Sequence, residues 1–175
     1  MDIPEIQIVD VSQQDIKKLQ EIARRTFHQS FAAVNTAENM KSYLDQHFSE
    51  ENLRSEIMNP HSRFFFALLE DKPVGYIKIN EREAQSVLPN DAGMEIERIY
   101  IDQSFKGRNI GNLLISKAVE CGISSGVSYL WLGVWEHNMP AIRFYEKNKF
   151  KKYSEHIFKL GDDPQTDWLM KRELA

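Results

Sequence analysis

A helical segment between two strand-like segments limits the fold of this chain more than any other sequence feature. Met94–Ile101 and Tyr129–Trp135 have the apolar patterns of strands, and Gly107–Ser125 places Ile110 and Leu114 on one helical face. Two strands of one sheet that are joined by a helix run parallel, and the crossover is right-handed. The sequence therefore predicts a parallel strand pair in the second half of the chain.

The rest of the chain predicts further strands and helices around this unit. The strand-like segments are Glu5–Val11, Arg63–Glu70, Val74–Asn80, Phe150–Leu160 and Thr166–Leu174, and helices are expected from Asp15, Thr36, Ser49 and Met139. Asp71–Pro73 predicts the turn of a hairpin, and the polar stretch Glu81–Gly93 is expected to be a mobile loop. Phe64–Phe66 is a continuous apolar run, as a buried strand requires. These elements predict an α/β (α+β) fold with a mixed sheet.

Length and composition favour one ordinary globular domain. The 175 residues contain no internal repeat or linker, so residues 1–175 are expected to form a single domain. The net charge of -4 argues against non-specific nucleic-acid binding and mildly favours a cationic small substrate. The chain has no apolar stretch long enough for a membrane span and no signal-like start. With Cys121 as its one cysteine, the expected compartment is the cytoplasm, without membrane association.

The segment Ile99–Gly111 has the features of an anion-binding turn. It runs from a strand through a turn that contains Gly107 and two cations, Lys106 and Arg108, and then into a helix. The first N–H groups of a helix lack partners within the helix, and its dipole adds partial positive charge. This segment alone fits a tight turn with close helix–sheet packing at Gly111 equally well.

Two motifs resemble the GNAT acetyltransferases. Lys106–Gly111 is similar to their coenzyme A loop, but it has Lys106 in place of Arg or Gln and Asn109 in place of the central glycine. The second motif matches at Asn138, Ala141, Phe144, Tyr145, Lys147 and Phe150. The resemblance implies a GNAT fold, in which a mixed sheet of about seven strands has helices on both faces, and acetyl-CoA as the co-substrate.

The whole chain is most similar to the bacterial PaiA-type spermidine/spermine acetyltransferases. This likeness rests on Glu38–Leu44, Met94–Ile101, Trp131–Glu136 and Gln165–Asp167. It implies direct acetyl transfer from acetyl-CoA to a primary amine of a polyamine such as spermidine or spermine. The oligomeric state, monomer or homodimer, is left open by the sequence. Two alternatives stay open: a non-catalytic acetyl-CoA-binding regulator, and an enzyme that acetylates another small amine or a protein amine.

The chemistry of acetyl transfer needs a base for the amine and an acid for the leaving thiolate. The resemblance assigns the acid to Tyr145, for which a packing role is the alternative. Glu95 and Glu97 lie two residues apart on one strand, so both are expected on the same face as Ile99 and Ile101. Either carboxylate could accept a proton through water, and either could instead bind a substrate ammonium or be solvated.

The resemblance also supplies the binding residues. Main-chain groups of Ile99–Ile101 should meet the pantetheine arm, and the diphosphate should lie on the turn. The expected coenzyme-binding residues are Ile99, Tyr100, Ile101, Lys106, Gly107, Arg108, Asn109, Ile110, Gly111, Asn112, Asn138 and Lys147. The acceptor is expected near Phe31, Asn35 and Tyr43. The histidines show no metal-ligand spacing, so no metal is predicted, and Cys121 is expected in the core rather than as a nucleophile.

Overall fold

Seven strands form one mixed sheet in the order β1-β2-β3-β4-β5-β7-β6 in the computed structural model, which describes residues 4–87 and 89–174. The strands are β1 Gln7–Asp10, β2 Ser62–Leu69, β3 Lys72–Asn80, β4 Gly93–Ile101, β5 Tyr129–Trp135, β6 Lys151–Leu160 and β7 Asp163–Glu173. The helices are α1 Ile16–Phe31, α2 Ala37–His47, α3 Glu50–Met58, α4 Ile110–Ser125 and α5 Met139–Lys147. The crossover through α4 makes β4 and β5 parallel, as predicted, and the other paired strands are antiparallel.

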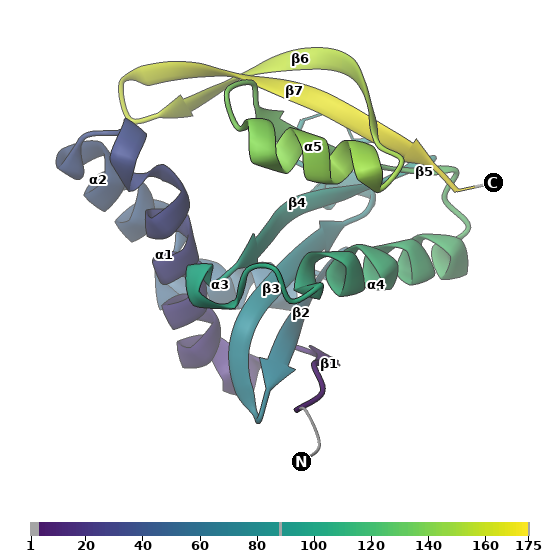
Figure 1. Cartoon of the computed structure of the whole chain (residues 1–175), viewed down its shortest axis with the longest axis horizontal. Helices are drawn as coiled ribbons and strands as arrows, with labels where there is room; N and C mark the ends of the chain where they lie inside the picture. Colours follow the sequence, from purple (N-terminus) through teal and green to yellow (C-terminus); the bar gives the residue numbers. More distant parts are fainter. Residues whose placement is uncertain (1–3, 88, 175) are drawn as a thin grey trace.

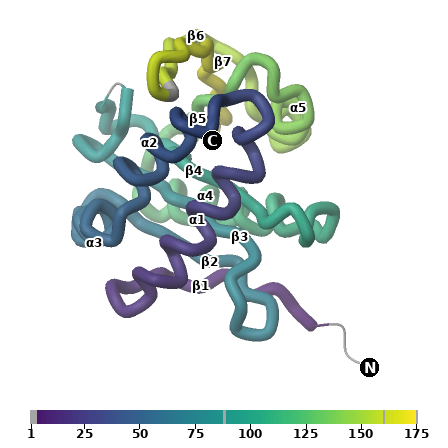
Figure 2. Tube along the Cα trace, turned by 90° about the vertical axis from the view of Figure 1, so that its left-hand side faces the viewer, coloured from purple at the N-terminus to yellow at the C-terminus, as the bar shows by residue number. Residues whose placement is uncertain are grey.

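Helices cover both faces of this sheet (Figure 1). α4 and α5 pack on one face, while α1, α2 and α3 pack on the other, which Figure 2 shows from the side of α1. The apolar run of β2 supplies both layers, because Phe65 joins the α4 side and Phe64 and Phe66 join the α1 side. All three phenylalanines are buried, so their predicted place in the core is confirmed.

Two boundaries differ from the sequence-based expectation because backbone conformation decides them. Glu70 and Asp71 have φ values of 49° and 65°, so these two residues make the β2–β3 turn and Lys72–Pro73 belongs to β3. Gly107 and Asn109 have φ values of 83° and 64°. A helix cannot begin in this left-handed region, so α4 starts at Ile110 instead of Gly107.

A β-bulge interrupts the pairing of β4 with β3. Lys78 pairs with Arg98, and the next residue of β3, Ile79, pairs with Ile96, so Glu97 is an extra residue on β4. A bulge of this kind changes the alternation of side chains along the strand. Glu97 and Arg98 consequently both point to the α1 side, where Glu97 contacts Lys78 and Arg98 contacts α3.

The bulge corrects one expectation about β4. Glu95 and Glu97 share a face, since both accept hydrogen bonds from Asn80, but this is not the face of Ile99 and Ile101. The two isoleucines pack in the layer of α4, on the opposite side of the sheet. The expected common face assumed strict alternation, which the extra residue breaks.

The same part of the sheet opens between β4 and β5. The two strands pair only over Gly93–Ile96 and Tyr129–Leu132. Beyond these residues β4 continues to pair with β3, and β5 continues to pair with β7, so the strands diverge from each other (Figure 1). The main-chain groups on the facing edges of Ile99–Ile101 and Gly133–Trp135 are thereby left without a β partner at the opening.

The stretch Glu81–Gly93 is anchored, in contrast to the mobile loop expected from its polarity. Gln85 is buried and accepts a hydrogen bond of 2.7 Å from the indole N–H of Trp131. Ser86 donates from its backbone N–H to Glu95 at 2.8 Å and also through its hydroxyl. Leu88, within this stretch, lies outside the described residues. The segment therefore forms part of the wall beside β4 and β5.

Candidate functional site

A cavity of about 780 Å³ occupies the opening between β4 and β5. One end, here called the loop end, is lined by the β4–α4 turn (Lys106, Gly107 and Asn109–Asn112) together with Asn138 and Tyr145. The other end, here called the carboxylate end, is lined by α1, α2 and the sheet, and it contains Glu95, Glu97, Asp167 and several aromatic rings. One continuous space thus joins a basic turn to an acidic, aromatic pocket.

The backbone of the loop end is shaped to receive an anion. A side chain at Gly107 would meet nothing within 4 Å, so glycine is needed there for its φ of 83°. The first hydrogen bond within α4 runs from the N–H of Leu113 to the carbonyl of Asn109, at 3.3 Å. The N–H groups of Ile110–Asn112 therefore have no partner within the helix. Their position at the cavity fits a diphosphate group.

Gly111 has a different role from Gly107. A Cβ at Gly111 would lie 2.8 Å from the ring of Phe144 and 3.3 Å from the side chain of Ile101. The glycine thus allows α4 to pack closely against α5. The positive φ of Gly107 and the close approach at Gly111 both match the interpretation as a tight turn with close packing, while coenzyme binding at this turn stays a prediction.

Two of the expected coenzyme-binding cations lie away from the lining of the cavity. The guanidinium of Arg108 lies over the ring of Phe105, 5.3 Å from its centre, and is exposed. Lys147 is exposed at the end of α5. Lys106 does line the cavity. The turn thus presents one lysine and the helix N–H groups directly to the cavity.

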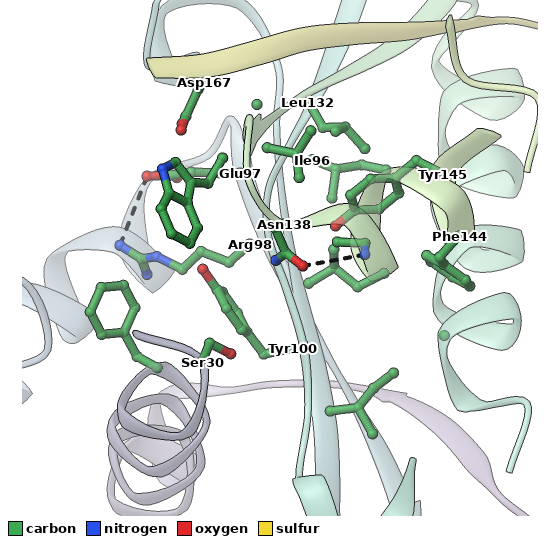
Figure 3. A pocket seen from close by; sticks show the side chains of 18 of the residues that line it. Ser30, Ile96, Glu97, Arg98, Tyr100, Leu132, Asn138, Phe144, Tyr145 and Asp167 are labelled. Carbon is green, nitrogen blue, oxygen red and sulfur yellow. Dashed lines mark hydrogen bonds and ion pairs between the residues drawn. The ribbon is translucent and has the colours of Figure 1, made fainter. Parts of the chain in front are cut away.

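Tyr145 lies in the wall of the loop end, with its hydroxyl directed toward the cavity (Figure 3). Its ring packs between Phe144 and Phe150, at centroid distances of 5.4 and 5.9 Å. Burial raises the pKa of Tyr145 above its ordinary value, so the phenol is protonated at neutral pH. Nearby, the side-chain oxygen of Asn138 accepts a hydrogen bond of 3.3 Å from the N–H of Ala141 and caps α5.

A balanced network of charges lies under the carboxylate end. Lys78 contacts Glu97 at 2.5 Å and Glu56 at 3.2 Å, and Arg98 donates to both oxygens of Glu56, at 2.7 and 3.0 Å. Burial alone would raise the pKa of Glu97, but the charges of Arg98 and Lys78 outweigh this effect and lower it. Glu97 is therefore a weak proton acceptor.

Glu95 has a different environment although it lies on the same face. It accepts hydrogen bonds from Asn80, at 3.0 Å, and from Ser86. Burial raises the pKa of Glu95, and these neutral donors oppose the shift only in part. Of the two glutamates, Glu95 is thus the better proton acceptor.

The three expected acceptor residues are not brought together in one wall. Phe31 and Tyr43 line the cavity and flank Phe27, each with a centroid distance of 4.5 Å to its ring. Asn35 lies outside the lining, where its oxygen accepts from Gln165 at 3.0 Å and its NH₂ donates to the carbonyl of Phe31. Asn35 therefore joins the α1–α2 connection to β7.

Asp167 is a cavity residue that the sequence reasoning did not assign to the site. It lies on β7, paired with Trp135 of β5 and His156 of β6, and burial raises its pKa to about 6. The run Gln165–Asp167 contributed to the family resemblance, but the face of this edge hairpin could not be read from its polar sequence.

Neither a metal cluster nor a membrane span is found in the part of the chain that the structure describes. Residues 4–87 and 89–174 contain no group of three or more His, Cys, Asp and Glu side chains placed to hold a metal ion. None of the helices within these ranges is long and apolar enough to cross a membrane.

Comparisons with known proteins agree with this geometry. A family model described as the acetyltransferase (GNAT) family matches residues 16–150. A relative named as an uncharacterized N-acetyltransferase in the pepI 3' region of Lactobacillus delbrueckii subsp. lactis is 41% identical over 170 residues, which cover 97% of this chain and 98% of the relative. The spermidine N(1)-acetyltransferase of Thermoplasma acidophilum is 25% identical over 172 residues, with 96% of this chain and 97% of the relative covered.

The fold is also found among solved structures. The crystal structure of the PaiA N-acetyltransferase from Thermoplasma acidophilum in complex with coenzyme A has a TM-score of 0.80 and 24% identity. The similarity covers 97% of this chain and 99% of that one. With the family match and the relative above, the chain belongs to the acetyltransferase (GNAT) family and is an acetyl-CoA-dependent N-acetyltransferase.

Proposed function

We propose that this enzyme transfers an acetyl group from acetyl-CoA directly to a primary amine of a polyamine such as spermidine or spermine. The observation that carries the proposal is the carboxylate end of the cavity, where acidic side chains and aromatic rings share one wall. Such a wall suits a flexible alkylammonium chain, since carboxylates attract its charges and ring faces attract cations. The named spermidine acetyltransferase of Thermoplasma acidophilum gives independent but distant support.

The loop end fits the coenzyme. When bound, acetyl-CoA supplies a thioester carbonyl that an amine can attack. Lys106 and the N–H groups of Ile110–Asn112 would hold the diphosphate, and the main chain of Ile99–Ile101 would hydrogen-bond the pantetheine arm. The amide of Asn138 reaches the same end of the cavity. For Arg108 and Lys147, which lie outside the lining, any contact would be with outer phosphate groups.

Two side chains are assigned to the proton transfers, Glu95 and Tyr145. Glu95 accepts the amine proton through water, because its pKa is raised while that of Glu97 is lowered by neighbouring cations. Tyr145 donates a proton to the departing thiolate, since its phenol is protonated and faces the cavity. Cys121 is buried on α4 and is not part of the cavity lining, which favours direct transfer over an acetylated cysteine.

An acceptor screen tests the proposal. Purified enzyme should release coenzyme A thiol from acetyl-CoA when spermidine or spermine is added, with a larger kcat/KM than for a lysine-containing peptide. A peptide that equals spermidine would contradict the polyamine assignment. Binding of acetyl-CoA without thiol release for any amine would favour the regulator. The lone cysteine supports a cytoplasmic enzyme, and gel filtration decides between a monomer and a homodimer.

A further inference from the structure

We infer that Asp167 binds a second ammonium group of the acceptor, the one that is not acetylated, and so makes the enzyme selective for amines with two or more charges. The inference rests on the polyamine acceptor proposed above. It concerns a residue of β7 that lies outside the coenzyme A loop and outside the motif of Asn138–Phe150, and to which the resemblance assigned no role.

The charges at the carboxylate end single out Asp167. Glu56 and Glu97 are balanced by the two buried cations, Lys78 and Arg98. Glu95 is held by neutral donors from Asn80 and Ser86. In residues 4–87 and 89–174, by contrast, no donor is hydrogen-bonded to the carboxylate of Asp167 and no cation pairs with it. A part-buried carboxylate without a partner is costly, and a cationic ligand would relieve that cost.

The space in front of Asp167 is shaped for a ligand. Gly133 of β5 faces the same side as Asp167, and a Cβ at Gly133 would already lie 3.4 Å from Oδ2 of the aspartate. The absence of a longer side chain at this position keeps the carboxylate open to the cavity. Aromatic rings of Tyr43, Trp135 and Phe158 line the same end, and Tyr43 is near enough for the charge of Asp167 to raise its pKa. A carboxylate among ring faces is a suitable site for an alkylammonium group.

The position of Asp167 separates it from the reacting centre. In Figure 3 the carboxylate lies on the side of Glu97, whereas Tyr145 lies across the cavity. An ammonium at Asp167 would therefore be remote from the thiolate that Tyr145 protonates, which leaves the other end of the acceptor for acetylation. The pKa of about 6 keeps Asp167 mostly ionised at neutral pH, as this role requires.

Acceptors that differ in the number of their ammonium groups test the inference, and two of them, 1,4-diaminobutane and butylamine, have the same carbon chain length. Thiol release is measured with 1,4-diaminobutane, spermidine and butylamine for the wild type, Asp167→Asn and Glu173→Gln, the last a matched loss of an exposed carboxylate on the same strand. Asp167→Asn should lower kcat/KM by roughly ten- to a hundredfold for diaminobutane and spermidine, which carry more than one ammonium, mainly through KM, and leave kcat/KM for butylamine unchanged. Glu173→Gln should behave as the wild type. Asp167→Glu should recover part of the preference.

A binding measurement separates this inference from the proposed function. Calorimetric titration with spermidine should show weaker binding to Asp167→Asn than to the wild type, whether or not the amine is acetylated. An equal loss for butylamine and diaminobutane, or unchanged spermidine affinity, would overturn the role of Asp167 while leaving the polyamine proposal intact. Wild-type enzyme that binds spermidine through Asp167 but releases no thiol would overturn the proposed function alone. A melting temperature at least as high as that of the wild type confirms that Asp167→Asn is folded.

Discussion

Tyr145 combines a packed ring with a hydroxyl that faces the cavity, so the two contributions can be separated by one substitution. Tyr145→Phe keeps the contacts with Phe144 and Phe150 and removes only the hydroxyl, the proposed proton donor. We predict that kcat falls on the order of 10²-fold, as for the loss of a general acid, while acetyl-CoA affinity is unchanged. Steady-state kinetics and calorimetric titration give the two quantities.

The comparison of kcat with Kd also identifies other roles of Tyr145. A phenylalanine variant with both values unchanged would make Tyr145 a packing residue and leave proton donation to water. Weaker acetyl-CoA binding without a change in kcat would make the hydroxyl a binding contact. Phe150→Leu tests the packing role separately, because it loosens the packing of the Tyr145 ring but retains its phenol.

Protonation of Asp167 should control the affinity for charged acceptors. Its pKa is about 6, so KM for diaminobutane should rise as the pH falls below 6 and level off above 7. His156 of β6 and Tyr43 of α2 face the same region, and the pKa of Tyr43 is raised to about 12, which keeps it neutral in this range. His156→Gln should retain the pH profile, and Asp167→Asn should flatten it. A pH profile that changes in His156→Gln but not in Asp167→Asn would contradict this assignment.

Ionisation of Asp167 changes the free energy of unfolding in the opposite direction to ionisation of a carboxylate in a salt bridge. Because burial raises the folded-state pKa of Asp167, the folded chain binds this proton more tightly than the unfolded chain does. The carboxylate therefore lowers the free energy of unfolding once the pH rises through about 6. Asp167→Asn should be at least as stable as the wild type at pH 7 to 8 in urea unfolding, with this advantage lost toward about pH 4.

At the residue level, the sequence predicted the parts of the site that short motifs specify. Lys106, Gly107 and Tyr145 lie at the cavity because a strand, a turn and two helices fix their positions along the chain. The positions of Asn35 and Asp167 relative to the cavity could not be predicted in this way. Whether they reach the cavity depends on how the β6–β7 hairpin lies over α2, a long-range contact that has no local sequence signal.

At the level of elements, strands and helices were predictable, but their register was not. The alternation in Met94–Ile101 correctly indicates a strand, and no residue in it announces a bulge at Glu97. The bulge becomes visible only when Lys78 and Ile79 of β3 are paired with it. As a consequence, two consecutive charged side chains, Glu97 and Arg98, both point to the α1 side of the sheet.

The packing of α4 on α5 gives a prediction about Gly111. A methyl group there would meet the ring of Phe144 at 2.8 Å, so Gly111→Ala should lower the free energy of unfolding by about 1–3 kcal/mol. Phe144→Leu removes the atoms in conflict. In a double-mutant cycle by urea unfolding, the cost of Gly111→Ala should therefore be smaller in the Phe144→Leu background. Additive losses would place the conflict elsewhere, for example at Ile101.

For the whole molecule, the opening between β4 and β5 divides the sheet into two parts. β1 to β4 carry α1, α2 and α3 on one side, whereas β5, β7 and β6 form the other wall of the cavity with α5 (Figure 1). The two parts share a short parallel ladder, the helix α4 and the loop contact of Gln85 with Trp131. A ligand that fills the opening would add contacts to both parts at once.

This architecture predicts that acetyl-CoA stabilises the fold as a whole. A ligand present at 100 times its Kd stabilises the native state by about 2.7 kcal/mol, and for a chain of this size each kcal/mol raises Tm by about 2–4 °C. A thermal scan with saturating acetyl-CoA should thus show a rise of about 5–10 °C. Tyr145→Phe should retain the rise, because in the proposed mechanism its hydroxyl serves proton transfer and not coenzyme binding. Lys106→Met should reduce it, since this lysine lines the loop end, whereas Lys147→Met, outside the lining, should have a smaller effect. Equal effects of the two lysine variants would mean that the diphosphate is not held by the turn that begins α4.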